Sequence, residues 1–128
     1  MKFVCKEMSI SDEEFGCTVT LSENEDDNEF EKQKTVDEIM DSIGQYIMLQ
    51  RTYGEDEYEE DYYYFETSDF DKSGELDDFE IILTENNFIL TIENDKYEIQ
   101  IDPIDQEWNE LKTAIKRITE HKGRLNIK

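Results

Sequence analysis

The chain has 128 residues, and its 35 Asp and Glu against 13 Lys and Arg give a formal net charge of −22 at pH 7. A surface this negative repels nucleic acid and anionic membranes and attracts cations or basic proteins, and no segment approaches the ~20 apolar residues of a membrane span. The length predicts a single domain over residues 1–128.

The first part of the chain predicts a β-hairpin. Residues 17–21 alternate between apolar and polar side chains, which indicates a half-buried strand, with residues 2–8 as its partner and residues 9–15 as the connection. The first residues turn polar too soon for a signal peptide, so we expect a cytoplasmic protein. In that compartment Cys5 and Cys17 are expected to stay reduced and to pack as small apolar side chains on neighbouring strands.

The next segment predicts a short amphipathic helix at residues 36–43. Its apolar residues recur at i, i+3, i+4 and i+7, Thr35 and Glu38 have the spacing of a capping box, and Gly44 can end the helix. Residues 23–31, which precede it, carry six carboxylates and predict a solvated, self-repelling loop.

Five further segments are rich in aromatic and branched residues and predict strands: 46–53, 62–67, 79–84, 88–93 and 96–101. Short polar connectors join the last three of these segments. That spacing indicates an antiparallel meander.

The C-terminal part predicts a helix near residues 105–122. Asp105 can cap it, Gly123 can end it, and we expect its apolar stripe to cover one face of the sheet. The stripe consists of Trp108, Leu111, Ala114, Ile115 and Ile118. Residues 112–128 hold six Lys and Arg against one carboxylate, which we interpret as an internal counterweight to the acidic body rather than a nucleic-acid contact.

Together these elements predict an α+β fold. We expect a mainly antiparallel β-sheet of about seven short strands, a short helix near residues 36–43, and a C-terminal helix near residues 105–122 that packs on the sheet.

Residues 69–80 have the ligand spacing of a calcium-binding loop. Oxygen-bearing side chains recur at the positions that hold a hard cation, and Gly74 can make the sharp turn between them. The candidate metal ligands are Asp69, Asp71, Ser73, Glu75, Asp77 and Glu80. The flanking segments predict strands, whereas an EF-hand loop lies between two helices. An acidic connection between strands is therefore the competing interpretation.

An acidic and aromatic segment is the candidate site for a protein partner. Tyrosine buries a large area at interfaces, and carboxylates steer a basic partner and pair with its Lys and Arg. The candidate residues are Glu55, Asp56, Glu57, Tyr58, Glu59, Glu60 and Asp61, followed by Glu25, Asp26 and Asp27. The competing interpretation is a solvated loop that keeps the protein soluble.

No catalytic residue is predicted. The sequence contains no nucleophile elbow, P-loop, dinucleotide fingerprint, HExxH motif or Cys–His pairing. We therefore expect a protein without enzymatic activity, and without a cofactor unless residues 69–80 bind Ca²⁺.

The order of several segments carries a family resemblance. These are Tyr46-Ile47-Met48-Leu49-Gln50-Arg51, Tyr62-Tyr63-Tyr64-Phe65-Glu66 after an acidic spacer, Phe79-Glu80-Ile81-Ile82-Leu83-Thr84 after a glycine-bearing turn, the strand from Phe88, and the closing helix. Over roughly residues 45–120 this order resembles the immunity protein 10 family of bacterial polymorphic-toxin systems. The sequence differs from that family in its longer segment before residue 44 and in Ser73-Gly74-Glu75, where the family has an aromatic–Gly–Gly run.

The resemblance implies a small cytoplasmic protein that binds and neutralises a cognate toxin, with no functional residues shared between family members. We therefore expect an acidic antitoxin whose partner is a toxin with a basic surface, such as a nuclease. A nuclease is positively charged where it holds phosphate, so an acidic protein can occupy that surface quickly. Two alternatives remain: a calcium-binding protein that uses residues 69–80, and a phage protein that mimics nucleic acid.

Overall fold

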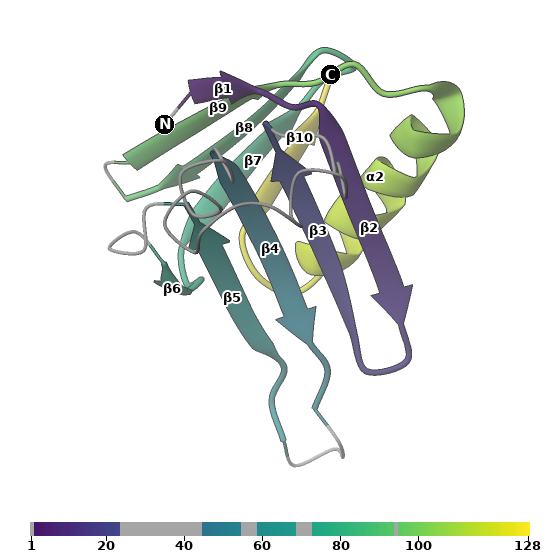
Figure 1. Ribbon diagram of the computed structural model, residues 1–128. Helices are drawn as coiled ribbons and strands as arrows, with labels where there is room; N and C mark the ends of the chain where they lie inside the picture. Colours follow the sequence, from purple (N-terminus) through teal and green to yellow (C-terminus); the bar gives the residue numbers. More distant parts are fainter. Residues whose placement is uncertain (1, 24–44, 55–58, 69–72, 94) are drawn as a thin grey trace, which may run out of the picture.

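The structure of the protein is a computed structural model that describes residues 2–23, 45–54, 59–68, 73–93 and 95–128 (Figure 1). Several predicted features lie outside the described residues. These are the helix at 36–43, the acidic residues 25–27 and 55–58, and the candidate metal ligands Asp69 and Asp71.

The first of two sheets has the strand order β1-β9-β8-β7-β10. Its strands are β1 (Lys2–Val4), β7 (Phe79–Leu83), β8 (Asn87–Ile92), β9 (Asp95–Gln100) and β10 (Arg124–Ile127). β7, β8 and β9 form the predicted antiparallel meander. β1 and β10 are the two edge strands and run parallel to their neighbours. The N-terminal and C-terminal segments therefore lie at opposite edges of one sheet.

The second sheet has its strands in sequence order, β2-β3-β4-β5-β6, and every pair is antiparallel. Its strands are β2 (Glu7–Glu13), β3 (Gly16–Ser22), β4 (Tyr46–Thr52), β5 (Tyr62–Thr67) and β6 (Gly74–Glu75). Among the described strands, β2 therefore has a hydrogen-bonded neighbour on one side only.

The structure confirms the α+β class and the mainly antiparallel pairing, but the described residues form ten strands rather than about seven. The expected connection at 9–15 is wrong, because strand β2 continues to Glu13. The expected strand at 2–8 is divided at Cys5 and Lys6, and its two parts join different sheets. Cys5 therefore lies between strands, whereas Cys17 lies on β3.

The C-terminal helix α2 (Asp105–Ile118) is shorter than the predicted 105–122. Asp105 does not cap it: the N-cap is Ile104, whose backbone N–H donates to Glu107 Oε1 at 3.1 Å. At the other end, the Thr119 hydroxyl donates to the Ile115 carbonyl at 2.8 Å and satisfies an acceptor of the last turn. Within the described ranges, α2 included, no helix is both long enough and apolar enough to cross a membrane.

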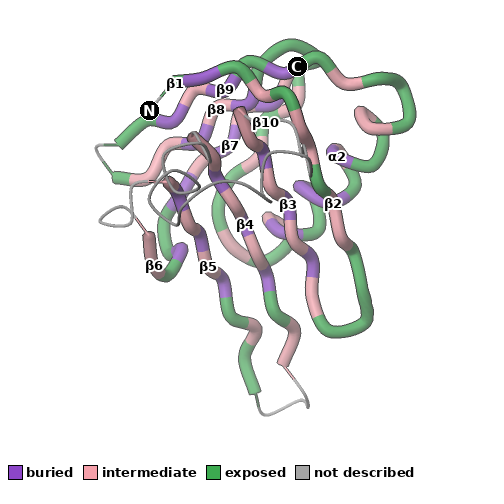
Figure 2. The backbone as a smooth tube through the Cα atoms, in the orientation of Figure 1, coloured by how far each residue is buried: buried purple, intermediate pink, exposed green. Residues whose placement is uncertain are grey.

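One hydrophobic core joins the two sheets and the helix. Strands of both sheets alternate between buried and partly exposed residues (Figure 2), as expected when one face of each sheet packs inward. The Phe65 and Tyr97 rings meet edge to face, with centroids 6.4 Å apart, and join β5 to β9. α2 packs on β2, β3 and β4, where the Cys17 thiol points to the Ala114 carbonyl at 3.7 Å. The expected packing of the helix on a sheet is therefore confirmed.

Gly123 does not end the helix but turns the chain into β10, with φ +81°. A Cβ atom there would lie 2.5 Å from Cζ of the buried Phe79 ring. We predict that Gly123→Ala lowers the free energy of unfolding by about 2–4 kcal/mol, because the left-handed conformation and the overlap with the ring both cost energy. Denaturant titration measures this loss.

The control is the same substitution in a Phe79→Leu background. There the smaller side chain leaves room for the Cβ, so the penalty of Gly123→Ala should fall by about 1 kcal/mol or more. An equal penalty in both backgrounds would show that the ring does not set the requirement for glycine.

Candidate functional site

The outer face of the second sheet is rich in tyrosine and carboxylates. Because the inner side chains of each strand face the core, the alternate ones face outward. From β2 to β6 the outer side chains are Glu7, Ser9, Ser11, Glu13; Thr18, Thr20, Ser22; Tyr46, Met48, Gln50, Thr52; Tyr62, Tyr64, Glu66; and Glu75. Among these described positions are three tyrosines and four glutamates but no lysine or arginine.

Two of the three tyrosines of this face bond to the same carboxylate. The Tyr46 hydroxyl donates to Glu66 Oε2 at 2.9 Å, and the Tyr64 hydroxyl donates to Glu66 Oε1 at 3.3 Å. Burial, followed by the contact with Glu66, raises the pKa of Tyr46 to about 12, so its hydroxyl stays protonated. The ring of Tyr64 stacks on that of Tyr62, with centroids 6.4 Å apart. The aromatic surface is therefore ordered before any partner arrives.

The outer face of the first sheet differs in charge. Its strand cations Lys2, Lys96 and Arg124 lie beside carboxylates: Lys2 and Lys96 approach Glu98 at 4.0 and 3.2 Å, and Arg124 approaches Glu80 at 3.7 Å. Positive and negative groups therefore balance on the first sheet, whereas the outer face of the second sheet is negative.

The outer face of the second sheet ends at the β2–β3 turn. Glu13 and Glu14 are exposed there, and Phe15 is 73% exposed. The turn is tied to the strand beside it, because the Tyr53 backbone N–H donates to the Phe15 carbonyl at 3.0 Å. A Cβ on Gly16 would lie 2.7 Å from the Arg51 carbonyl oxygen, so only glycine allows this close approach.

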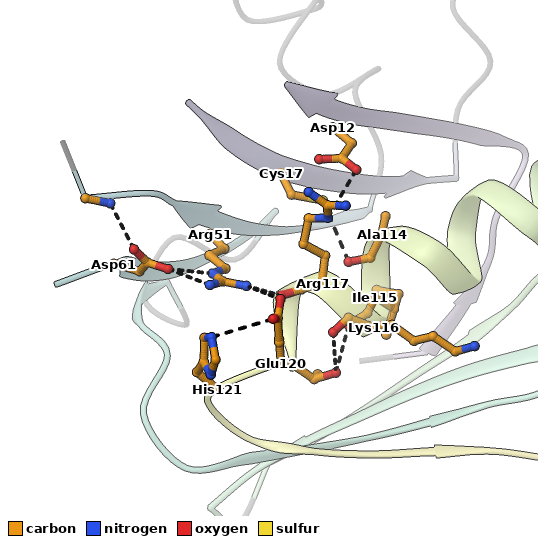
Figure 3. Close-up of polar contacts among 12 residues, drawn as sticks. Asp12, Cys17, Arg51, Asp61, Ala114, Ile115, Lys116, Arg117, Glu120 and His121 are labelled. Atoms are coloured by element: carbon orange, nitrogen blue, oxygen red, sulfur yellow. Dashed lines mark hydrogen bonds and ion pairs between the residues drawn. The ribbon is translucent and has the colours of Figure 1, made fainter. Parts of the chain in front are cut away.

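A buried guanidinium supports the same end of the sheet from inside (Figure 3). Arg51, on the inner face of β4, is only 5% exposed. Its Nε and Nη2 lie 2.8 and 2.6 Å from Asp61 Oδ2, and Nη1 donates to the Arg117 carbonyl and approaches Glu120 Oε2 at 3.3 Å. The guanidinium also lies over the ring of Tyr53, 5.0 Å from its centroid. Arg51 thus joins β4, the start of β5 and the end of α2.

The pKa values of this cluster follow its geometry. The Gly54 backbone N–H, 2.9 Å from Asp61 Oδ1, and the Arg51 guanidinium lower the pKa of Asp61. Burial alone would lower the pKa of Arg51, but its contacts with Asp61, Tyr63 and Glu120 raise it overall. Both groups are therefore charged at neutral pH.

The basic C-terminal segment is paired with the acidic body. Arg117 lies 3.3 Å from Asp12 of β2, Lys122 lies 3.6 Å from Asp77, and Arg124 approaches Asp78 and Glu80. These ion pairs agree with the interpretation of the C-terminal segment as an internal counterweight to the acidic charge of the rest of the chain.

The structure separates the residues predicted to bind a partner. Glu59 and Glu60 are exposed, whereas Asp61 points to Arg51 and is 24% exposed. The remaining predicted residues lie outside the described ranges. Tyr46, Tyr62 and Tyr64 are not among the residues that the sequence predicts to bind a partner. The alternation of residues 46–52 and 62–67 was the available signal, since it places these rings on the face opposite the core.

The candidate calcium ligands that the structure describes have other contacts. Ser73 Oγ accepts the Thr67 backbone N–H at 3.1 Å, Asp77 approaches Lys122, and Glu80 approaches Arg124. Strands β5 and β7, rather than helices, lie on either side of this segment. Among the described residues, no group of three or more His, Cys, Asp or Glu is arranged to hold a metal ion. Calcium binding therefore stays a prediction that rests on the sequence spacing.

The two thiols are not arranged as nucleophiles. Cys17 is fully buried, and burial, followed by Asp12, raises its pKa to about 11. Burial also raises the pKa of Cys5, whose thiol donates to the Glu7 carbonyl at 3.1 Å. Both thiols are therefore protonated at neutral pH and poorly reactive.

The Arg51–Asp61 pair predicts a pH-dependent stability. Because the folded-state pKa of Asp61 is lowered, its contribution is complete above its unfolded pKa near 3.9 and is lost as pH falls through its folded pKa. We predict that Asp61→Asn lowers the free energy of unfolding by about 2–3 kcal/mol at pH 7, less than for a fully buried pair because Asp61 is partly exposed.

Denaturant titrations of the wild type and Asp61→Asn between pH 7 and pH 2 measure this difference, which should shrink at the acidic end. Glu60→Gln is the control, because it removes the charge of an exposed neighbour and should change the stability by less than about 0.5 kcal/mol. A difference between wild type and Asp61→Asn that does not vary with pH would contradict the assignment.

Comparison with known proteins identifies no family for this chain. No protein-family model matches it, and no curated protein matches it significantly in sequence.

Proposed function

We propose that the protein is an acidic antitoxin that binds a basic toxin domain and neutralises it by covering its positive surface. The outer face of the second sheet carries this proposal, because it combines three tyrosines and four glutamates with no lysine or arginine among its described residues. Tyrosine is enriched at protein interfaces, and complementary charge selects the partner.

The electrostatics of the chain suit rapid inhibition. With a net charge of −22, the protein attracts a basic domain over a Debye length of about 10 Å at 0.1 M salt. Such steering raises association rates toward about 10⁸–10⁹ M⁻¹s⁻¹ at low salt. An antitoxin needs this speed, because it must bind before the toxin acts on its target.

The surface is also ordered in a way that favours affinity. Glu66 fixes Tyr46 and Tyr64, and the Arg51 pair with Asp61 fixes the start of β5 beside Tyr62, which is 50% exposed. Side chains that are already ordered lose less conformational entropy on binding. The aromatic rings supply buried area, and the surrounding carboxylates pair with Lys or Arg of the toxin.

The direct test is rescue and inhibition. The protein is co-expressed with the toxic gene encoded next to its own, and the purified toxin is assayed with increasing amounts of the protein. We expect growth to recover and toxin activity to fall at a stoichiometric ratio. Unchanged toxicity, or a tightest natural ligand that is itself anionic, would contradict the proposal; capture of a host DNA-binding enzyme would favour a nucleic-acid mimic instead.

A pair of matched variants tests the location of the interface. Met48→Lys with Gln50→Lys adds two positive charges to the outer face of the second sheet, on its central strand β4. Because like charges then face the basic toxin, we predict at least a tenfold rise in Kd, equivalent to about 1.4 kcal/mol. Titration calorimetry at two salt concentrations measures the effect.

The control is Ile89→Lys with Thr91→Lys, which makes the same change of charge on the outer face of the first sheet, on its central strand β8. Its Kd should stay within about threefold of the wild-type value. Equal losses from the two variants would mean that net charge alone, and not the outer face of the second sheet, determines binding.

A further inference from the structure

Strand β2 presents an open edge. Two backbone hydrogen bonds at the ends of β3 show which of its residues bond to β4. The Tyr53 N–H donates to the Phe15 carbonyl, and the Glu23 N–H donates to the Gln45 carbonyl. Both pairs continue the register of β3 with β4, so the odd-numbered residues of β3 bond to β4. Because bonding alternates along an antiparallel strand, the even-numbered residues of β3 bond to β2. Their partners in β2 are Glu7, Ser9, Ser11 and Glu13.

The other residues of β2 are Met8, Ile10 and Asp12. Their backbone groups therefore point away from the sheet. In the part of the chain that the structure describes, their outward N–H and C=O groups have no hydrogen-bond partner. An edge of seven residues with free donors and acceptors is a template for one more strand.

A pocket lies beside this edge. It has a volume of about 380 Å³ and lies between β2 and α2, lined by Ile10, Asp12, Asn109, Glu110, Thr113 and Ala114. Figure 1 shows β2 at the border of the second sheet with α2 next to it. An added strand would therefore place alternate side chains against this pocket.

The charge of the edge decides what can occupy it. Glu7, Asp12 and Glu13 lie on the strand and Glu110 faces it from the helix, while Arg117 pairs with Asp12. A second copy of the chain pairing antiparallel about Ile10 would set Glu7 against Glu13 of the other copy. Like charges directly opposite destabilise a strand pair, so self-association is disfavoured and a basic segment is favoured.

We propose that an extended basic segment of the partner protein adds to the second sheet as a strand beside β2. Its backbone bonds to Met8, Ile10 and Asp12, its Lys or Arg side chains meet Glu7 and Glu13 on the outer face, and its alternate, apolar side chains enter the pocket on the helix side. This proposal rests on the proposed function, since the segment belongs to the same basic partner.

The test uses a synthetic peptide, acetyl-Lys-Val-Lys-Val-Lys-Val-Lys-amide, and amide hydrogen exchange followed by NMR on the full chain. With saturating peptide, the amides of Met8, Ile10 and Asp12 should exchange at least tenfold more slowly, while those of Ser9 and Ser11, already bonded to β3, should change little. A control peptide, N-methylated at its five central amides, has the same charge, but it cannot donate to the carbonyls of β2 and its methyl groups prevent the close approach of a paired strand, so it should give no protection.

Two helix variants locate the site. Thr113→Arg puts a positive charge in the pocket and should weaken peptide binding at least tenfold. Gln106→Arg makes the same change of charge at an exposed position that does not line the pocket, and it should alter peptide binding less than threefold. Equal melting temperatures establish that both variants fold.

The outcomes separate this proposal from the proposed function. Unchanged exchange at Met8, Ile10 and Asp12 would overturn the docking edge, as would equal protection by the methylated peptide. The antitoxin proposal would still stand in either case if toxin activity is inhibited. Protection of the edge without any inhibition of a basic toxin would support the edge and contradict the antitoxin.

Discussion

The ion pair between Arg51 and Asp61 is the constraint on which the end of the second sheet beside the β2–β3 turn depends. A guanidinium that is 5% exposed is stable inside the fold only because Asp61, Glu120 and the Arg117 carbonyl surround it. These partners come from the beginning of β5 and the end of α2. One buried cation therefore fixes the place where the chain enters β5, and with it the position of the exposed Tyr62.

The charges of the molecule are distributed unequally between its two sheets. Cations of the N- and C-terminal segments are used in ion pairs with carboxylates of the first sheet and of its connections. The outer face of the second sheet has carboxylates and tyrosines but no cation among its described residues. Among the described residues, the outer face of the second sheet therefore has a local excess of negative charge, which favours the steering of a basic partner.

The sequence predicts local elements better than their partners. The meander from Phe79 to Gln100 follows from alternation and short connectors, and the stripe of Leu111, Ala114, Ile115 and Ile118 identifies the helix. Residues 9–13 of β2 are predicted as part of a connection, because Ser9, Ser11 and Asp12 are typical of loops. β10 was missed, because its four residues lie in a segment whose basic charge dominated its interpretation.

The candidate site depended on contacts that no local pattern reveals. Arg51 and Asp61 are ten residues apart, and Arg51 and Glu120 are 69 residues apart. No spacing rule brings such groups together: the pairing of β4 with β5 places Asp61 beside Arg51, and the packing of α2 on β4 places Glu120 there. Similarly, the alternation of residues 46–52 and 62–67 predicts two outward faces, but only the register of β4 with β5 sets Tyr46, Tyr64 and Glu66 side by side.

The two proposed binding surfaces are continuous, because β2 belongs to both. Its residues Glu7, Ser9, Ser11 and Glu13 face outward with the tyrosines, while its open edge faces sideways toward the pocket. A strand added beside β2 would extend the second sheet by one strand. The rest of the partner would then lie next to the outer face. The backbone of that strand supplies affinity that depends little on sequence, and the glutamates and tyrosines supply selectivity for a basic surface. A single partner could thus engage both surfaces without any rearrangement of the core.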